Sequence, residues 1–83
     1  MVYGLRWTPV ALHALSNLPK EISERVVRKA NAIIDNPHPF LERMVKYSIF
    51  KLRVGDYRAF IDIDEEKKEM HVLNVKHRKH TYK

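Results

Sequence analysis

Residues 50–63 read FKLRVGDYRAFIDI, two alternating runs separated by the dipeptide Gly55-Asp56. A two-residue loop with glycine at its first central position is typical of a type I′ or II′ hairpin turn, which fixes the register of the flanking strands. The predicted cross-strand pairs are Val54 with Tyr57, Arg53 with Arg58, Leu52 with Ala59, Lys51 with Phe60 and Phe50 with Ile61. This stretch predicts the centre of an antiparallel sheet.

The predicted register sorts these side chains onto two faces, because neighbouring residues of a strand point to opposite sides. The apolar set is expected to form the core face: Phe50, Leu52, Val54, Tyr57, Ala59, Ile61 and Ile63. The opposite face carries Lys51, Arg53, Arg58 and Phe60. Like charges directly opposite one another disfavour pairing, so we infer that Arg53 and Arg58 serve to bind an anion. An aromatic ring beside the cations suits a phosphate-bearing ligand.

A third strand is predicted in the run Met70-His71-Val72-Leu73-Asn74-Val75. We expect Leu73 and Val75 to point into the core, and this phase sends the alternate residues onto the cationic face: Val72, Asn74, Lys76 and Arg78. A basic tail follows, with His77, Lys79, His80 and Tyr82.

The first half of the chain predicts a strand and two helices. Residues 2–7 alternate as a strand, and Thr8-Pro9 is a helix-start signal. We expect that helix to end near Asn17, with a buried side made of Val10, Ala14 and Leu15. A second helix is predicted from Lys20 to about Asp35, because apolar residues recur there at helical spacing: Ile22, Val26, Ala30, Ile33 and Ile34.

The order of elements, β-α-α-β-β-β, predicts an α+β two-layer fold. A helical hairpin should cover one face of a small, mostly antiparallel four-stranded sheet, with the other face left partly open for the cations. Phe40, Leu41 and Met44 are expected to tuck under the sheet edge. Residues 1–83 are expected to form a single domain.

Composition narrows the class of protein. The chain is 45% hydrophobic and 31% charged, as in folded proteins, and without cysteine it has no disulfide or thiolate metal site. No apolar run approaches the ~20 residues of a membrane span, and we expect a cytoplasmic protein.

The net charge is +6, and residues 43–83 carry eleven Lys and Arg against six Asp and Glu. Nucleic acid is the leading partner; a generic solubilising charge is the alternative.

From their spacing alone, the residues favour binding of nucleic acid or of an acidic protein partner over catalysis. His77 and His80 have no carboxylate nearby, so we expect no metal and no cofactor. The chain also lacks a glycine-rich phosphate loop, a paired nucleophile and base, and a carboxylate pair on the cationic face. RNA, however, carries its own nucleophile, the 2′-hydroxyl, and cations can position and stabilise its attack on phosphate. Lys51, His77 and His80 are the candidate bases, and Tyr82 could stack on a nucleobase.

Two segments resemble the signature of the RelE/ParE toxin superfamily: residues 51–58, KLRVGDYR, and residues 75–82, VKHRKHTY. Residues 7–11, WTPVA, are also similar to that family, so the resemblance covers essentially the whole chain. It implies a toxin of a type II toxin–antitoxin system, made during stress and neutralised by a RelB-like antitoxin in a heteromeric complex. RelE-type members inhibit translation as mRNA interferases, endoribonucleases that cleave mRNA in the ribosomal A site.

By position, the resemblance implies a catalytic set of Lys51, Arg58, Arg78 and Tyr82. It implies Arg53 as a supporting cation. With Arg53, the other cations of the basic face and tail are expected to bind RNA phosphate: Lys46, Lys76, Lys79 and His80. RelE itself often has another lysine where this chain has Ile49, and Lys46 could substitute for it. Two alternatives stay open: a ParE-like toxin that inhibits DNA gyrase, and a catalytically inert relative that binds only its antitoxin or RNA.

Overall fold

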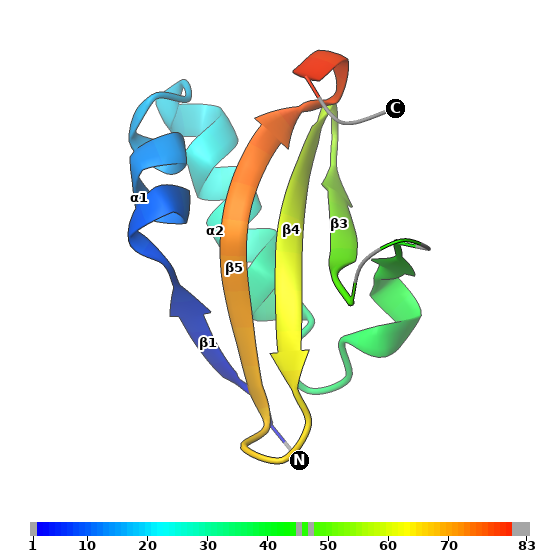
Figure 1. The fold of residues 1–83 in the computed structure, drawn as a ribbon. Helices are drawn as coiled ribbons and strands as arrows, with labels where there is room; N and C mark the ends of the chain where they lie inside the picture. Colours follow the sequence, from blue (N-terminus) through cyan, green and yellow to red (C-terminus); the bar gives the residue numbers. More distant parts are fainter. Residues whose placement is uncertain (1, 45, 47, 81–83) are drawn as a thin grey trace.

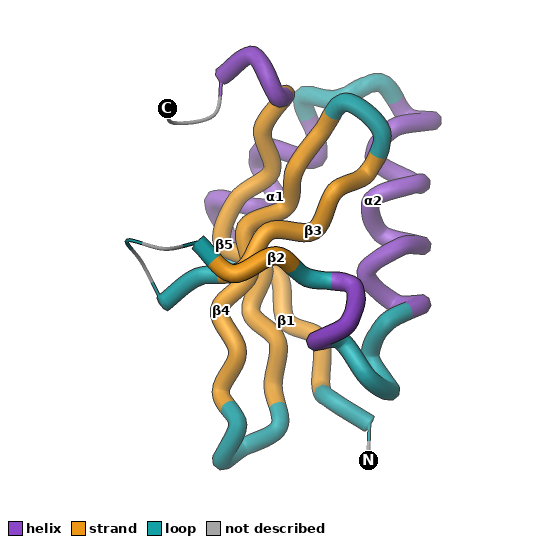
Figure 2. Tube along the Cα trace, turned by 90° about the vertical axis from the view of Figure 1, so that its right-hand side faces the viewer, coloured by secondary structure: helices purple, strands orange, loops and turns teal. Residues whose placement is uncertain are grey.

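Five strands and two α-helices make up the part of the chain that the structure, a computed structural model, describes: residues 2–44, 46 and 48–80 (Figure 1). The elements are β1 (Gly4–Trp7), α1 (Pro9–Ser16), α2 (Lys20–Ala32), β2 (Glu42–Arg43), β3 (Phe50–Val54), β4 (Tyr57–Asp64) and β5 (Glu69–His77), with short 3₁₀ turns η1 (His38–Phe40) and η2 (Arg78–His80). The strands form one sheet in the order β1-β5-β4-β3-β2. Both helices lie against the same face of that sheet (Figures 1 and 2).

The predicted α+β two-layer architecture is confirmed, whereas the predicted count of four strands is wrong. β1 pairs with β5 in parallel, and the remaining neighbours are antiparallel. The extra strand is β2, whose Glu42 and Arg43 pair with Lys51 and Phe50 of β3. Two residues are too few to show a period-two pattern, so only the fold of the flanking chain could reveal β2.

The register of the central hairpin is confirmed at all five predicted pairs, from Val54–Tyr57 to Phe50–Ile61. Gly55 has a φ of 58°. Among the described residues other than glycine, only Lys68 has a positive φ. Asp56 therefore has negative φ, which fits a type II′ turn and excludes type I′.

Replacing Gly55 with alanine should lower the free energy of unfolding by about 1 kcal/mol, because an L residue is disfavoured at positive φ. The new Cβ would also lie 3.3 Å from Nη2 of Arg25. A loss of ~4–8 °C in Tm, measured by circular dichroism, is expected for a domain of this size. Gly4→Ala is the matched control, since its Cβ would meet nothing closer than 3.7 Å; an equal loss in both variants would contradict this explanation.

A β-bulge in β5 overturns one part of the predicted phase. Phe60 pairs with Asn74 but Ile61 pairs with Val72, so Leu73 is an extra residue without a partner in β4. Val72 is consequently buried in the core, although the sequence pattern placed it on the cationic face. Leu73, predicted to point inward, is half-buried and lies outside the core cluster. Beyond the bulge the prediction holds, and Val75 is buried.

The helices supply the second layer of the core. Thr8 caps α1 as predicted: its Oγ1 accepts from the Ala11 amide at 3.2 Å and donates to the Val72 carbonyl at 2.9 Å. Val10 was expected to be buried, yet it is 59% exposed and Ala11 takes its place in the core. α2 packs its predicted residues Ile22, Val26 and Ala30 against the sheet but ends at Ala32, three residues early. The last two residues of the predicted stripe, Ile33 and Ile34, therefore join the core from the chain that follows the helix.

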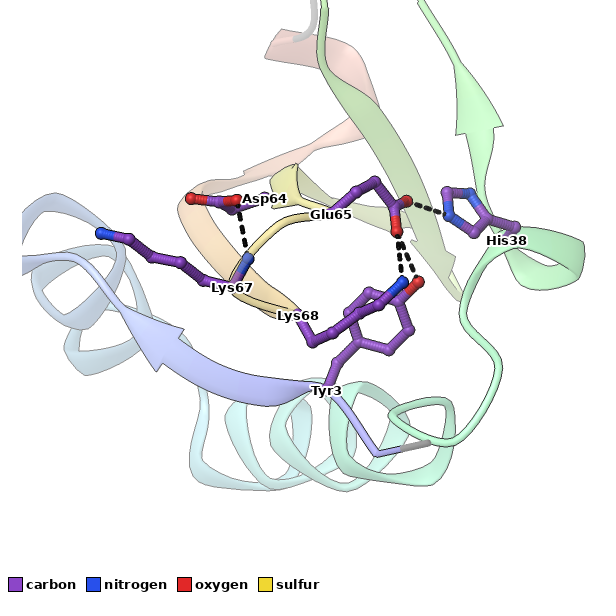
Figure 3. Close-up of polar contacts among 6 residues, drawn as sticks. All are labelled: Tyr3, His38, Asp64, Glu65, Lys67 and Lys68. Carbon is purple, nitrogen blue, oxygen red and sulfur yellow. Dashed lines mark hydrogen bonds and ion pairs between the residues drawn. The ribbon is translucent and has the colours of Figure 1, made fainter.

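A network around Glu65 joins the turn between β4 and β5 to the chain before β1 and to η1 (Figure 3). The Tyr3 hydroxyl donates to Glu65 at 2.8 Å, His38 Nε2 lies 2.5 Å from the other carboxylate oxygen, and Lys68 donates at 3.3 Å. These hydrogen bonds, led by that from Tyr3, lower the pKa of Glu65 from 4.5 to about 2. The same hydrogen bond raises the pKa of Tyr3, and Glu65 raises that of Lys68.

Acid should weaken the fold through Glu65. Because its pKa is lower in the folded state, its contribution to stability is fully present above about pH 4.5 and is lost as the pH falls towards about 2. The urea midpoint of the wild type should therefore fall between pH 5 and pH 2 by more than that of Glu65→Gln. If the urea midpoints of the two proteins fell in parallel with pH, the ionised Glu65 carboxylate would contribute nothing to stability.

Candidate active site

The open face of the sheet carries a row of three cations on adjacent strands. Arg53 of β3 lies opposite Arg58 of β4, and Arg58 lies opposite Lys76 of β5. Residues directly opposite one another project to the same face, so the three side chains share the face away from the helices. The sequence-based expectation that these residues gather on one face is thereby confirmed.

A second row lies beside the first and runs through Glu42, Lys51, Phe60 and Asn74, on β2, β3, β4 and β5. Glu42 and Lys51 form an ion pair of 3.8 Å between Oε1 and Nζ. The Lys51 side chain is only 26% exposed, whereas that of Glu42 is 68% exposed. The cationic face thus includes a carboxylate that the sequence analysis did not place there.

The two rows meet at a hollow of about 210 Å³ on the β2 side of the sheet. Its lining residues are Pro39, Phe40, Leu41, Glu42, Lys51, Arg53 and Arg58. Three of these residues carry cationic side chains, Lys51, Arg53 and Arg58, and one, Glu42, carries a carboxylate. The net charge of the lining is therefore positive, and the guanidinium groups can each offer a two-pronged hydrogen bond to a phosphate.

The end of β5 brings Arg78 to the β3–β4 turn. The Arg78 amide donates to the Asp56 carbonyl at 2.7 Å, and its Nε lies 3.9 Å from Asp56 Oδ1. Arg78 does not line the hollow of Lys51, Arg53 and Arg58; its side chain is 61% exposed at one end of the sheet. A ligand that contacts both places would have to extend along the open face.

The structure separates His77 from the cationic face. His77 pairs with Tyr57, whose position belongs to the core-facing set, and their rings meet edge to face at 5.0 Å. Its Nδ1 accepts from the Lys79 amide at 3.2 Å. The candidate base His77 thus lies away from the face that carries Lys51.

The other predicted site residues are exposed or lie outside the described part. Lys46 and Lys79 are exposed, the first between β2 and β3 and the second in η2. The His80 side chain and Tyr82 lie outside the described residues, so their predicted roles stay predictions.

Sequence reasoning missed four residues of the hollow: Pro39, Phe40, Leu41 and Glu42. Phe40 was expected to tuck under the sheet edge but is 56% exposed. Glu42 joins the hollow only because β2 pairs with β3. The sole sequence signal was proximity: Phe40 and Glu42 closely follow Pro37-His38-Pro39, which could have marked a fixed turn leading into the edge of the sheet.

The described residues include no group of three or more His, Asp or Glu side chains arranged to hold a metal ion. None of the helices in the described part has the length and apolar character needed to cross a membrane.

Comparison with known proteins assigns the chain to a family. The profile of the family described as "ParE toxin of type II toxin-antitoxin system, parDE" matches residues 5–82. A chain of the toxin–antitoxin complex RelBE2 from Mycobacterium tuberculosis is 31% identical, with 94% of this chain and all of that chain covered and a TM-score of 0.85. No curated protein matches.

Two more distant structures share the fold. A chain of the archaeal RelE–RelB complex from Pyrococcus horikoshii OT3 is 22% identical, with 98% of this chain and 100% of that chain covered and a TM-score of 0.79. The free form of a mutant RelE toxin from E. coli is 24% identical, with 90% and 82% covered and a TM-score of 0.75. Given the family match over residues 5–82, this chain belongs to the RelE/ParE superfamily of toxins of type II toxin–antitoxin systems.

Proposed function

We propose that this toxin is a metal-independent endoribonuclease that inhibits translation in the cytoplasm by cleaving mRNA in the ribosomal A site. The observation that carries the proposal is the hollow that Lys51, Arg53 and Arg58 line together, with Lys76 next in register. We also propose that a RelB-like antitoxin neutralises it in a heteromeric complex. The 31% identical relative was solved as a toxin–antitoxin complex, which supports this partner.

The proposed reaction is an in-line attack of a 2′-hydroxyl on the adjacent phosphate. A bond forms between the 2′ oxygen and phosphorus while the bond to the 5′ oxygen breaks, which leaves a 2′,3′-cyclic phosphate and a 5′-hydroxyl. Negative charge grows on the non-bridging oxygens during the attack. In this proposal Lys51, Arg53 and Arg58 hold the phosphate and stabilise that charge, as preorganised cations do in other phosphoryl-transfer sites.

The reaction also moves two protons: one leaves the 2′-hydroxyl, and one is delivered to the 5′ oxygen by solvent water. We assign acceptance of the first proton to Glu42, because a carboxylate oxygen can act as a general base and this one lies beside Lys51, at 3.8 Å from its Nζ. Lys51 in an ion pair is better suited to binding phosphate than to accepting a proton. Arg78 would contact the RNA further along the face, and Tyr82 would orient the substrate.

Primer extension on an mRNA in a translating extract tests this function, with the protein added in the presence and in the absence of ribosomes. Cuts confined to A-site codons, and seen only with ribosomes, are expected. The absence of cuts in both reactions would refute the nuclease.

Inhibition of DNA gyrase is the second candidate, and the match to the ParE family favours it. A supercoiling assay with purified gyrase separates the two functions. Loss of supercoiling without any cleavage of mRNA would support gyrase as the target.

A further inference from the structure

Phe40 presents an aromatic ring to solvent at the rim of the cationic hollow. It is 56% exposed, and it lines the same hollow as Lys51, Arg53 and Arg58. Among the described residues, the ring–ring contacts join Tyr3 to His38, His38 to Phe50 and Tyr57 to His77, so the face of Phe40 is not taken by another ring. A large apolar group left in water beside three cations is available to a ligand.

The backbone around Phe40 is held in place by contacts on both sides. Its amide donates to the Pro37 carbonyl at 2.9 Å, and the Leu41 amide donates to the His38 carbonyl at 3.2 Å, which closes η1. Pro37 is fully buried, while the His38 ring lies 5.6 Å from that of Phe50 and pairs with Glu65 (Figure 3). The segment is thus fixed on both sides of Phe40, and η1 lies beside β2 at the edge of the sheet (Figure 2).

A nucleotide matches this combination better than a phosphate alone. Phosphate needs only the cations, whereas a nucleotide adds a flat base that gains from stacking on an aromatic ring. Because the backbone that carries the ring is already held, only the side-chain rotation of Phe40 has to be ordered when a base stacks on it.

We propose that Phe40 is the stacking platform for one base of a single-stranded RNA whose phosphate is held by Lys51, Arg53 and Arg58. This inference rests on the proposed function and deepens it, because it names the part of the chain that contacts a base. An exposed ring could also dock on a protein. The positive lining of the hollow favours RNA, and the protein partner is an outcome of the test.

Binding of a short, dye-labelled RNA with 2′-O-methyl sugars tests the proposal without cleavage, because the attacking hydroxyl is blocked. The probe is a pentanucleotide at low salt, and its Kd is measured by fluorescence anisotropy. In a second series, each position in turn carries an abasic sugar. The proteins are the wild type, Phe40→Ala, Phe40→Tyr and, as a matched control, Val10→Ala, which shortens another exposed apolar side chain, on α1.

Stacking predicts that Phe40→Ala raises Kd about tenfold or more, whereas Phe40→Tyr and Val10→Ala bind like the wild type. Removing the base at one position should weaken the wild type by a similar factor and leave Phe40→Ala unaffected. This non-additivity marks a direct contact between ring and base, which a structural role of Phe40 would not produce.

Several results would overturn the stacking role. The first two are a wild type that does not bind the probe and a Phe40→Ala variant that binds it as the wild type does. The others are abasic substitutions that weaken both proteins equally, and a Phe40→Ala variant that loses affinity for the antitoxin but not for the RNA. Failure of the nuclease is separate, because it is detected by primer extension. A wild type that binds with the predicted pattern but does not cut mRNA would retain the stacking site and lose the catalytic function.

Discussion

Arg58→Ala is expected to lower the rate of mRNA cleavage on the ribosome about 100- to 1,000-fold while the fold stays intact. Arg58 lies at the centre of the cationic row, between Arg53 and Lys76, and lines the hollow. Removing one preorganised donor to a developing anionic oxygen typically costs this factor in kcat. Single-turnover cleavage on programmed ribosomes measures it directly.

Stability should behave differently from activity in this variant. Arg58 faces two cations across the sheet, so alanine removes like-charge repulsion along with the side chain. The free energy of unfolding is therefore expected to stay within about 1 kcal/mol of that of the wild type. This pattern, in which a residue opposes folding and serves the site, is the usual trade-off at functional positions.

Two variants serve as controls for Arg58→Ala. Lys29→Ala removes an exposed cation from α2, on the far side of the sheet, and should leave cleavage unchanged. Arg58→Lys keeps the charge but loses the planar fork, and should give an intermediate rate. An Arg58→Ala protein that is folded and cuts at the wild-type rate would show that the hollow is not where the phosphate reacts.

The central hairpin was predictable because its information is local. The Gly55-Asp56 turn fixes the register, and the register alone places Lys51, Arg53 and Arg58 on one face. That part of the candidate site follows from some ten residues of sequence. Thr8-Pro9 was predictable for the same reason, since a cap and a helix start are set by adjacent residues.

The parts that the sequence did not predict depend on contacts between distant segments. β2 exists through pairing with β3, and this pairing brings Glu42 beside Lys51 at the hollow, whereas Phe40 is carried to its rim by η1. The bulge at Leu73 has no signal in its own strand, because Val72 and Leu73 are equally apolar and alternation cannot tell which is inside. The carbonyls of both residues accept hydrogen bonds from Thr8, a partner 64 and 65 positions away in the chain.

Val72→Asp is therefore expected to destabilise the protein far more than Leu73→Asp. Val72 is fully buried, so an aspartate there would be an unpaired charge in the core, which costs about 3–5 kcal/mol. A domain of this length has about 4–12 kcal/mol of stability in total, so the substitution should remove from about a quarter to all of it.

Leu73→Asp is the matched control, since it makes the same change one residue further along β5. Leu73 is half-buried and lies outside the core cluster, and its aspartate can reach water. We expect a cost below about 1 kcal/mol. Urea unfolding at pH 7 compares the two free energies. Equal losses, or a larger loss in Leu73→Asp, would mean that β5 lacks the bulge and keeps simple alternation. Without a bulge, residues 72 and 76 would point to the same side of the sheet, because side chains alternate along a regular strand. A buried Val72 would then place Lys76 on the core face and not on the face that carries Arg58. The position of one unpaired residue thus decides which cations the open face presents.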